Sequence, residues 1–75
     1  MHKVKINLVT GKDLREFVDI CSQLPGKIQI VGMDESGEVR VNAKSLFGAS
    51  YSMIWTDTVC ESDKDIYSHI RKFAY

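Results

Sequence analysis

The sequence predicts an α+β fold, a two-layer sandwich in which helices cover one sheet. Three segments alternate polar and apolar residues with the period of a strand, and two others repeat apolar residues with the period of a helix. A capping serine and a further stretch rich in apolar residues indicate a short helix and a fourth strand. Turn residues separate these segments, so the chain reads strand, helix, strand, strand, helix, strand, helix. Its 75 residues contain no internal repeat or linker, and we expect one domain over residues 1–75.

The first strand is predicted over Lys3 to Val9. Its inward-facing residues alternate with polar ones: Val4, Ile6 and Leu8. Thr10-Gly11 ends the strand, and Thr10 or Lys12-Asp13 opens the helix that follows. The apolar residues of this helix share one face: Leu14, Phe17, Val18, Cys21 and Leu24. Pro25-Gly26 then ends the helix.

The next two strands form a predicted hairpin. The second strand covers Lys27 to Val31, and the third covers Glu38 to Asn42. The residues expected to face inward are Ile28, Ile30, Val39 and Val41. Between the strands, Asp34 to Gly37 is a turn that ends on glycine, which favours a direct reversal of the chain.

A short helix and a fourth strand follow the hairpin. Ser45 is a suitable N-cap for a helix over Leu46 to Ser52. The fourth strand is expected around Met53 to Cys60, but its phase is ambiguous. Trp55 and Val59 share one parity, whereas Ile54 and Cys60 share the other. A β-bulge or a late start of the strand would reconcile the two.

The last helix is expected after Ser62, which would serve as its N-cap. Asp63 and Asp65 would then lie in its first turn, close to the positive end of the helix dipole. Its predicted buried stripe is Ile66, Ile70 and Phe73.

Composition excludes several classes of function. Ten acidic residues balance ten basic ones, which argues against nucleic-acid binding through bulk charge. No apolar run approaches the roughly 20 residues of a membrane span, and the first residues do not resemble a signal peptide, so we expect a cytoplasmic protein. Cys21 and Cys60 are expected to be buried free thiols. We expect no metal site, because zinc needs about four ligands and this chain does not offer them at suitable spacing. We also expect no cofactor.

One segment carries a specific resemblance. Residues 41–49 read Val-Asn-Ala-Lys-Ser-Leu-Phe-Gly-Ala. This stretch resembles the regulatory-serine segment of HPr, the small phosphocarrier of the bacterial sugar phosphotransferase system. The order of elements predicted above is also the HPr order, βαββαβα. The resemblance implies an open-faced, four-stranded antiparallel sheet with three helices on one face.

The resemblance also implies roles for individual residues. Ser45 matches the family's phosphorylatable serine, and Leu46 and Phe47 match apolar residues of its partner-docking surface. Lys44 is a further candidate for partner contact. Gly48 matches a glycine that lets the short helix sit closely, whereas a later apolar docking residue of the family falls at Ser50.

The chain departs from the family where phosphate would be carried. The phosphohistidine position falls near Thr10, the supporting arginine near Lys12 and the helix-starting proline near Asp13. A threonine ester is too low in energy for phosphate relay, and the Asp13 carboxylate repels a phosphate dianion. The only histidines, His2 and His69, lie elsewhere. We therefore expect no phosphoenolpyruvate-driven relay and no enzymatic activity.

The resulting expectation is a non-catalytic, HPr-like regulator in carbon catabolite regulation, a monomer or a strand-swapped dimer. Its expected partners are phosphotransferase components, HPr kinase or a transcription regulator, and neither nucleic acid nor membrane. Two other interpretations stay open: a phosphocarrier with an atypical acceptor such as His69, and a degenerate interaction module outside sugar transport. Ser45 itself has a purely structural interpretation, an N-cap that contributes about 1 kcal/mol.

Overall fold

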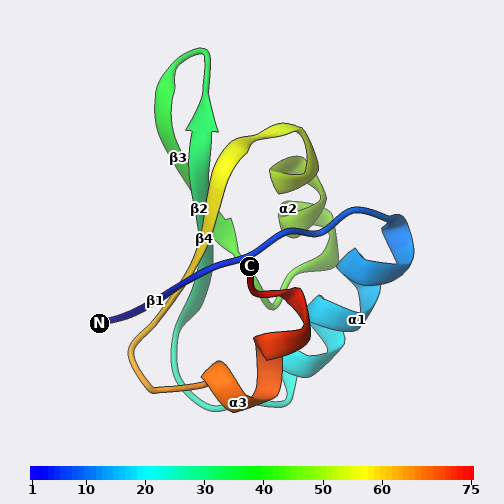
Figure 1. Ribbon diagram of the computed structural model, residues 1–75, viewed down its shortest axis with the longest axis vertical. Helices are drawn as coiled ribbons and strands as arrows, with labels where there is room; N and C mark the ends of the chain where they lie inside the picture. The colour runs from blue at the N-terminus through cyan, green and yellow to red at the C-terminus, as the bar shows by residue number, and fades with distance from the viewer.

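In the computed structural model, which describes residues 1–75, a sheet forms one layer and the helices form the other (Figure 1). The elements follow the predicted order: β1 (His2–Lys5), α1 (Gly11–Ser22), β2 (Ile28–Asp34), β3 (Gly37–Asn42), α2 (Leu46–Ser50), β4 (Thr56–Ser62) and α3 (Tyr67–Ile70). Two short 3₁₀ segments extend the last two helices: η1 (Tyr51–Ile54) after α2 and η2 (Arg71–Phe73) after α3.

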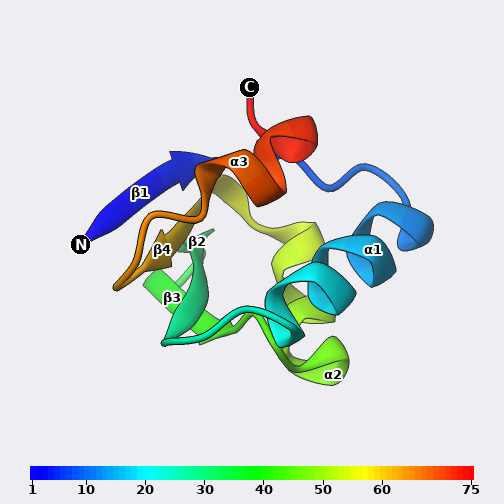
Figure 2. The same cartoon turned by 90° about the horizontal axis from the view of Figure 1, so that it is seen from below.

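The four strands form one antiparallel sheet in the order β1-β4-β2-β3. β2 and β3 are the predicted hairpin, with Asp34 opposite Gly37 at its tip. β4 lies between β1 and β2, so a strand from the end of the chain joins a strand from its beginning to the hairpin. Seen from below, the helices lie together on one face of the sheet, and the other face is open (Figure 2). The coarse fold prediction is therefore confirmed.

The core lies between the helices and the covered face of the sheet. The predicted stripe of α1 is buried except for Leu24, which is half-buried, and the stripe of the last helix is buried throughout. Phe17 of α1 meets Phe73 of η2 edge to face, with ring centroids 5.5 Å apart. From the sheet, Ile28, Ile30 and Cys60 complete this core. The ring contact between Phe17 and Phe73 packs η2 against α1.

β1 is shorter than the alternation predicts. It ends at Lys5, and Ile6 instead forms an isolated bridge with Ala74 near the end of the chain. The Asn7 N–H donates to the Phe73 carbonyl at 2.8 Å, which continues this pairing. The alternating pattern of residues 6–9 therefore reflects contact with the chain end as well as with the sheet.

β4 has both a late start and a β-bulge, the two features that would reconcile its ambiguous phase. It begins late, at Thr56, so Ile54 lies outside the strand in η1. Val31 pairs with Val59 and Met33 with Thr56, so the register shifts and leaves an extra residue on β4. Asp57 adopts a φ of 54° at this irregularity. The bulge returns Cys60 to the buried face of the sheet.

The predicted N-cap at Ser62 is wrong. β4 continues to Ser62, which is buried and pairs with both His2 and Ile28. α3 begins only at Tyr67, whose N–H donates to the Asp65 carboxylate at 3.1 Å. Pairing with two neighbouring strands thus takes precedence over the local capping preference. No helix of the chain is long and apolar enough to cross a lipid bilayer.

Candidate functional site

The β3–α2 junction is a tight turn that places Ser45 at the start of α2. The Asn42 side chain accepts a hydrogen bond from the Lys44 N–H at 2.9 Å, and the Ser45 N–H donates to the Asn42 carbonyl at 3.2 Å. Ala43 is fully buried, which anchors the turn against the core. Ser45 is then extended, with φ −108° and ψ 116°, as an N-cap requires.

Ser45 caps α2, as the sequence predicts. Its hydroxyl oxygen accepts from the Gly48 N–H at 3.2 Å, and its carbonyl accepts from the Ala49 N–H at 2.8 Å. The side chain is half-buried, and Ala49 below it is completely buried. The hydroxyl therefore stands at the edge of the helix layer, where it is both a cap and reachable from solvent.

Apolar side chains are exposed immediately after Ser45. Phe47 is 76% exposed and Leu46 is 45% exposed, so neither is a core residue. Phe47 meets Tyr51 edge to face, with centroids 5.7 Å apart. Ile54, 83% exposed, follows Tyr51 by three residues in η1, where residues three apart eclipse each other. We call Leu46, Phe47, Tyr51 and Ile54 the α2 apolar surface.

Sequence reasoning missed half of this surface. The pattern assigned Ile54 to the fourth strand, whereas the late start of β4 leaves it on η1. Tyr51 directly follows Ser50, which is polar where the resemblance would place an apolar docking residue. Its spacing of four residues from Phe47 was the available signal, because such residues are neighbours on a helix.

Lys44 takes a different position from Leu46 and Phe47. Its Nζ donates to the Leu24 carbonyl at 2.6 Å, so the side chain lies against the end of α1. Gly48 also differs from the expectation. A Cβ at this position would lie 3.5 Å from Ser45 Oγ and 3.8 Å from Val41 Cβ, which are ordinary contacts. Close packing of α2 therefore does not require glycine at residue 48.

The N-terminus of α1 is where the resemblance places the altered phosphocarrier position. Thr10 is the N-cap, and its hydroxyl accepts from the Asp13 N–H at 3.1 Å. In return, the Asp13 carboxylate accepts from the N–H groups of Val9 and Thr10 at 3.1 and 3.2 Å. This capping box places a carboxylate of the chain itself at the positive end of the helix. Lys12 is exposed in the same turn.

The remaining candidate groups lie apart from these two helix starts. His2 begins β1 at the sheet edge, and His69 is exposed in the last turn of α3. Cys21 and Cys60 are free and buried, as predicted. Burial raises the pKa of each thiol to about 12, which makes both poor nucleophiles at neutral pH. No group of three or more possible metal ligands occurs.

The geometry thus separates two features: a capped serine beside the α2 apolar surface, and a helix start that carries its own carboxylate in a capping box. No protein-family model, curated protein or solved structure matches the chain.

Proposed function

We propose that this chain is an HPr-like regulatory protein that acts by protein–protein contact and carries no phosphate relay. Its partner docks on the α2 apolar surface, and phosphorylation of Ser45 at the edge of that surface controls docking. The observation that carries the proposal is the adjacency of the capped Ser45 hydroxyl to exposed Leu46 and Phe47.

The layout of the fold supports the HPr-like assignment. A four-stranded antiparallel sheet with all helices on one face is what the resemblance over residues 41–49 implies. The serine of that segment also sits at a helix start, as a regulatory phosphosite at an N-cap would. A phosphate there accepts hydrogen bonds from N–H groups, so it can be added without unfolding the domain.

The α1 capping box supports the absence of relay. A phosphoryl group at a helix start is held by free N–H groups and the helix dipole. Here the Thr10 hydroxyl already takes the Asp13 N–H, and the Asp13 carboxylate takes the N–H groups of Val9 and Thr10, so a negative charge of the chain itself lies beside this helix start. Repulsion between the carboxylate and a phosphate disfavours transfer to Thr10.

Exposed aromatic surface supports a protein partner. Phe47 and Tyr51 present an aromatic pair to solvent, and aromatic residues are enriched among interface hot spots. Burying a phenylalanine side chain contributes about 1.5–3 kcal/mol, which is about a 10- to 150-fold change in Kd. Phe47 is therefore the residue whose loss should weaken docking most.

The first experiment tests the switch. The protein is incubated with ATP and an HPr kinase, and its intact mass is measured before mapping of any phosphate. We expect one acid-stable phosphate on the wild type and none on Ser45→Ala. Unmodified wild-type protein would remove the serine switch from the proposal. An acid-labile phosphate after incubation with enzyme I and phosphoenolpyruvate would instead establish a phosphohistidine carrier.

The second experiment tests the docking surface. Binding of Ser45-phosphorylated protein to an HPr-responsive transcription regulator is measured for wild type, Phe47→Ser and Tyr67→Ser. Tyr67 is 50% exposed on α3, away from α2, and serves as the matched aromatic control. We expect at least tenfold weaker binding for Phe47→Ser and no change for Tyr67→Ser. Equal loss in both variants, or loss in neither, would reject the α2 apolar surface as the docking site.

A further inference from the structure

β3 is an edge strand, and its outer side has no neighbour in the sheet. The strand order β1-β4-β2-β3 places it last. Figure 1 shows the β2–β3 hairpin extending past the helices, so the helix layer does not cover its tip. An edge strand presents a row of backbone N–H and C=O groups that can pair with another chain. β3 is therefore a place where a second chain can join the sheet.

The ladder with β2 leaves Glu38 and Arg40 with outward-facing backbone groups. The Ala43 N–H donates to the Ile28 carbonyl at 3.0 Å, so these two residues form a hydrogen-bonded pair. Because such pairs alternate along an antiparallel ladder, every second residue from Ala43 back to Gly37 bonds to β2. The residues between them point their N–H and C=O groups outward. Outside the ladder, Glu38 and Arg40 form hydrogen bonds only through their side chains.

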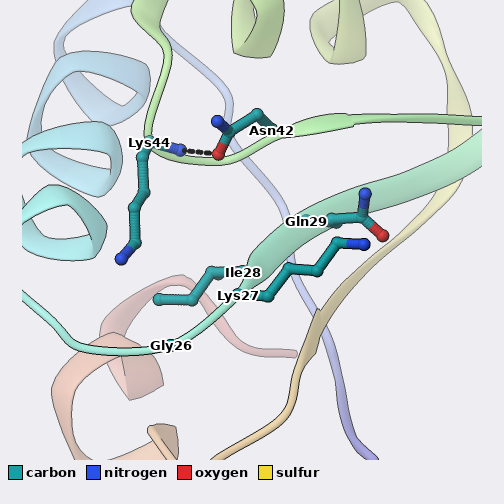
Figure 3. Close-up of a pocket in the computed structure, with 6 residues that line it drawn as sticks. All are labelled: Gly26, Lys27, Ile28, Gln29, Asn42 and Lys44. Carbon is teal, nitrogen blue, oxygen red and sulfur yellow. Dashed lines mark hydrogen bonds between the residues drawn. The ribbon is translucent and has the colours of Figure 1, made fainter.

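The chain itself occupies the backbone groups on either side of these two residues. The Asn42 carbonyl accepts from the Ser45 N–H at 3.2 Å, and the Asn42 side chain accepts from the Lys44 N–H at 2.9 Å (Figure 3). At the hairpin tip, the Ser36 N–H donates to the Asp34 carboxylate at 2.8 Å. The free part of the edge is thus short, which limits the registers in which a partner strand can pair.

Charge selects one register for pairing with a second copy of β3. In an antiparallel pair, residues with outward backbone groups must lie opposite each other. A two-fold axis at Glu38 would place two carboxylates opposite each other, and an axis at Arg40 would do the same with two guanidinium groups. Like charges directly opposite destabilise a strand pair. With the axis at Val39, each Glu38 instead lies opposite Arg40 of the second copy, so both contacts join opposite charges.

The side chains of Glu38 and Arg40 are available for these contacts. Their exposed fractions are 63% and 43%. Within one copy, Glu38 Oε2 accepts from Arg40 Nη2 at 3.1 Å, which leaves Glu38 Oε1 free. The guanidinium of Arg40 also donates to Gln29 and Glu61 through Nη1, and its Nε–H stays free. In the pair of copies, negative and positive groups would alternate around the axis.

Val39 adds an apolar contact on the other face of the sheet. It is half-buried and lies opposite Gly32, which has no side chain to cover it. Val41, two residues further on, packs against the core, whereas Val39 does not belong to it. Across an axis at Val39, the two valines form a non-hydrogen-bonded pair, in which side chains approach most closely. The same register therefore joins charges on one face and covers an apolar side chain on the other.

The opposite edge of the sheet lacks this complementarity. The Ile6 N–H donates to the Thr58 carbonyl at 3.1 Å, so the residues of β1 with outward backbone groups include Lys3 and Lys5. These lysines offer only like charge to a second copy, and the Lys5 carbonyl already accepts from the Tyr75 N–H at 3.3 Å. The formal net charge of the chain is zero, so no overall repulsion opposes association through β3.

We propose that β3 pairs with β3 of a second copy of this chain, antiparallel and with Val39 at the two-fold axis, so that the two sheets become one. Each Glu38 exchanges both backbone hydrogen bonds with Arg40 of the second copy. Each copy keeps all its own strands, which distinguishes this dimer from a strand-swapped one. The contact uses neither Ser45 nor the α2 apolar surface, so it stands apart from the proposed function.

Sedimentation equilibrium of the whole protein tests the dimer. We expect a monomer–dimer equilibrium for the wild type. Glu38→Arg places like charges opposite each other at both contacts and should weaken the dimer by about tenfold or more. Asp19→Arg makes the same change of charge at an exposed position of α1 and should leave the dimer Kd within about twofold. A wild type that stays monomeric at about 1 mM, or equal weakening by both variants, would overturn the proposal.

A mixing experiment tests the register. Arg40→Glu also places like charges opposite each other and should weaken the dimer when it is alone. A mixture of Glu38→Arg with Arg40→Glu restores opposite charges at both contacts, so the two variants should associate more tightly with each other than either does with itself. Circular dichroism first establishes that each variant is folded. A mixture of folded variants that associates no better than its components would overturn the register.

Amide hydrogen exchange locates the contact in the wild type without any substitution. The Glu38 and Arg40 amides should exchange more slowly at high protein concentration than at low, because the dimer supplies their acceptors. Exchange at Lys3 and Lys5 should not depend on concentration. Protection that rises at the lysines instead would indicate strand exchange through β1 and would overturn the proposal. Dimerisation that leaves the Glu38 and Arg40 amides unprotected would overturn it as well.

Discussion

Gly26 lies in the loop between α1 and β2, and replacing it with alanine tests the geometry of that loop. Its φ is +87°, and a Cβ would lie 2.3 Å from Asp63 Oδ1 and 3.1 Å from Asp63 Cγ. The same Asp63 oxygen accepts from the Lys27 N–H at 3.0 Å. Gly26→Ala therefore forces a left-handed alanine and displaces a carboxylate that anchors the next residue.

The magnitude follows from these two effects. A left-handed conformation costs an L-residue about 1–2 kcal/mol. Loss of the exposed hydrogen bond from Lys27 to Asp63 adds about 1–1.5 kcal/mol. We expect Gly26→Ala to lower the free energy of unfolding by about 3 kcal/mol, a large share of the stability of a domain this small.

Urea denaturation followed by the fluorescence of Trp55, the only tryptophan, measures this loss. With an m value of about 1 kcal/mol/M, the midpoint should fall by about 3 M. Gly37→Ala is the matched control, because Gly37 has φ +111° but nothing within 4 Å of its Cβ. It should lose only the conformational part, about 1–2 kcal/mol.

A double-mutant cycle separates the two contributions. In an Asp63→Ala background the carboxylate is gone, so Gly26→Ala should cost only about 1–2 kcal/mol. Equal losses for Gly26→Ala in both backgrounds, matching that of Gly37→Ala, would show that Asp63 does not pack against Gly26. The geometry described for the loop between α1 and β2 would then be wrong.

Three further predictions concern the core and α2. Ser45→Ala should lower the free energy of unfolding by about 1 kcal/mol, because the cap of α2 is lost. Ser45→Asp should retain the cap. Equal urea midpoints for Ser45→Ala and the wild type would contradict the capping geometry. Gly48→Ala should raise stability by about 0.5–1 kcal/mol, because its Cβ meets only ordinary contacts; a lower thermal midpoint would mean that the helix needs glycine after all. Burial raises the pKa of Cys21 and Cys60 from 9.0 to about 12, so the stability from neutral thiols is complete below pH 9 and is lost as the pH rises toward 12. Urea midpoints from pH 8 to 11 should fall accordingly, and rapid labelling of either thiol by a disulfide reagent at pH 8 would contradict the burial.

The parts of the fold that the sequence predicts are those decided by local pattern. The α1 stripe has a twelve-residue helix in which to repeat, and Thr10 with Asp13 forms its capping box from residues three apart. The hairpin is likewise local, since one short turn joins its two strands. Ser45 was identifiable as a cap for the same reason.

The parts that escaped depend on distant segments. Ser62 has a capping side chain, yet pairing with β1 and β2 draws it into the sheet. Ile54 joins the α2 apolar surface only because β4 starts late. The pocket lined by residues 26–29 together with Asn42 and Lys44 (Figure 3) likewise forms only after the sheet has brought these segments together. None of these outcomes is encoded in a single stretch of residues.

The pairing of β1 with β4 has a consequence for folding order. It aligns His2 with Ser62 and, through Ile6 and Ala74, joins the two ends of the chain. Closing a loop of about 60 residues costs roughly 3.5 kcal/mol in chain entropy, whereas a hairpin forms locally within about 1–10 μs. During synthesis, β1 therefore leaves the ribosome before β4 and remains unpaired until β4 has followed. Lys3 and Lys5, charged residues on a strand only four residues long, discourage pairing with another chain during that interval.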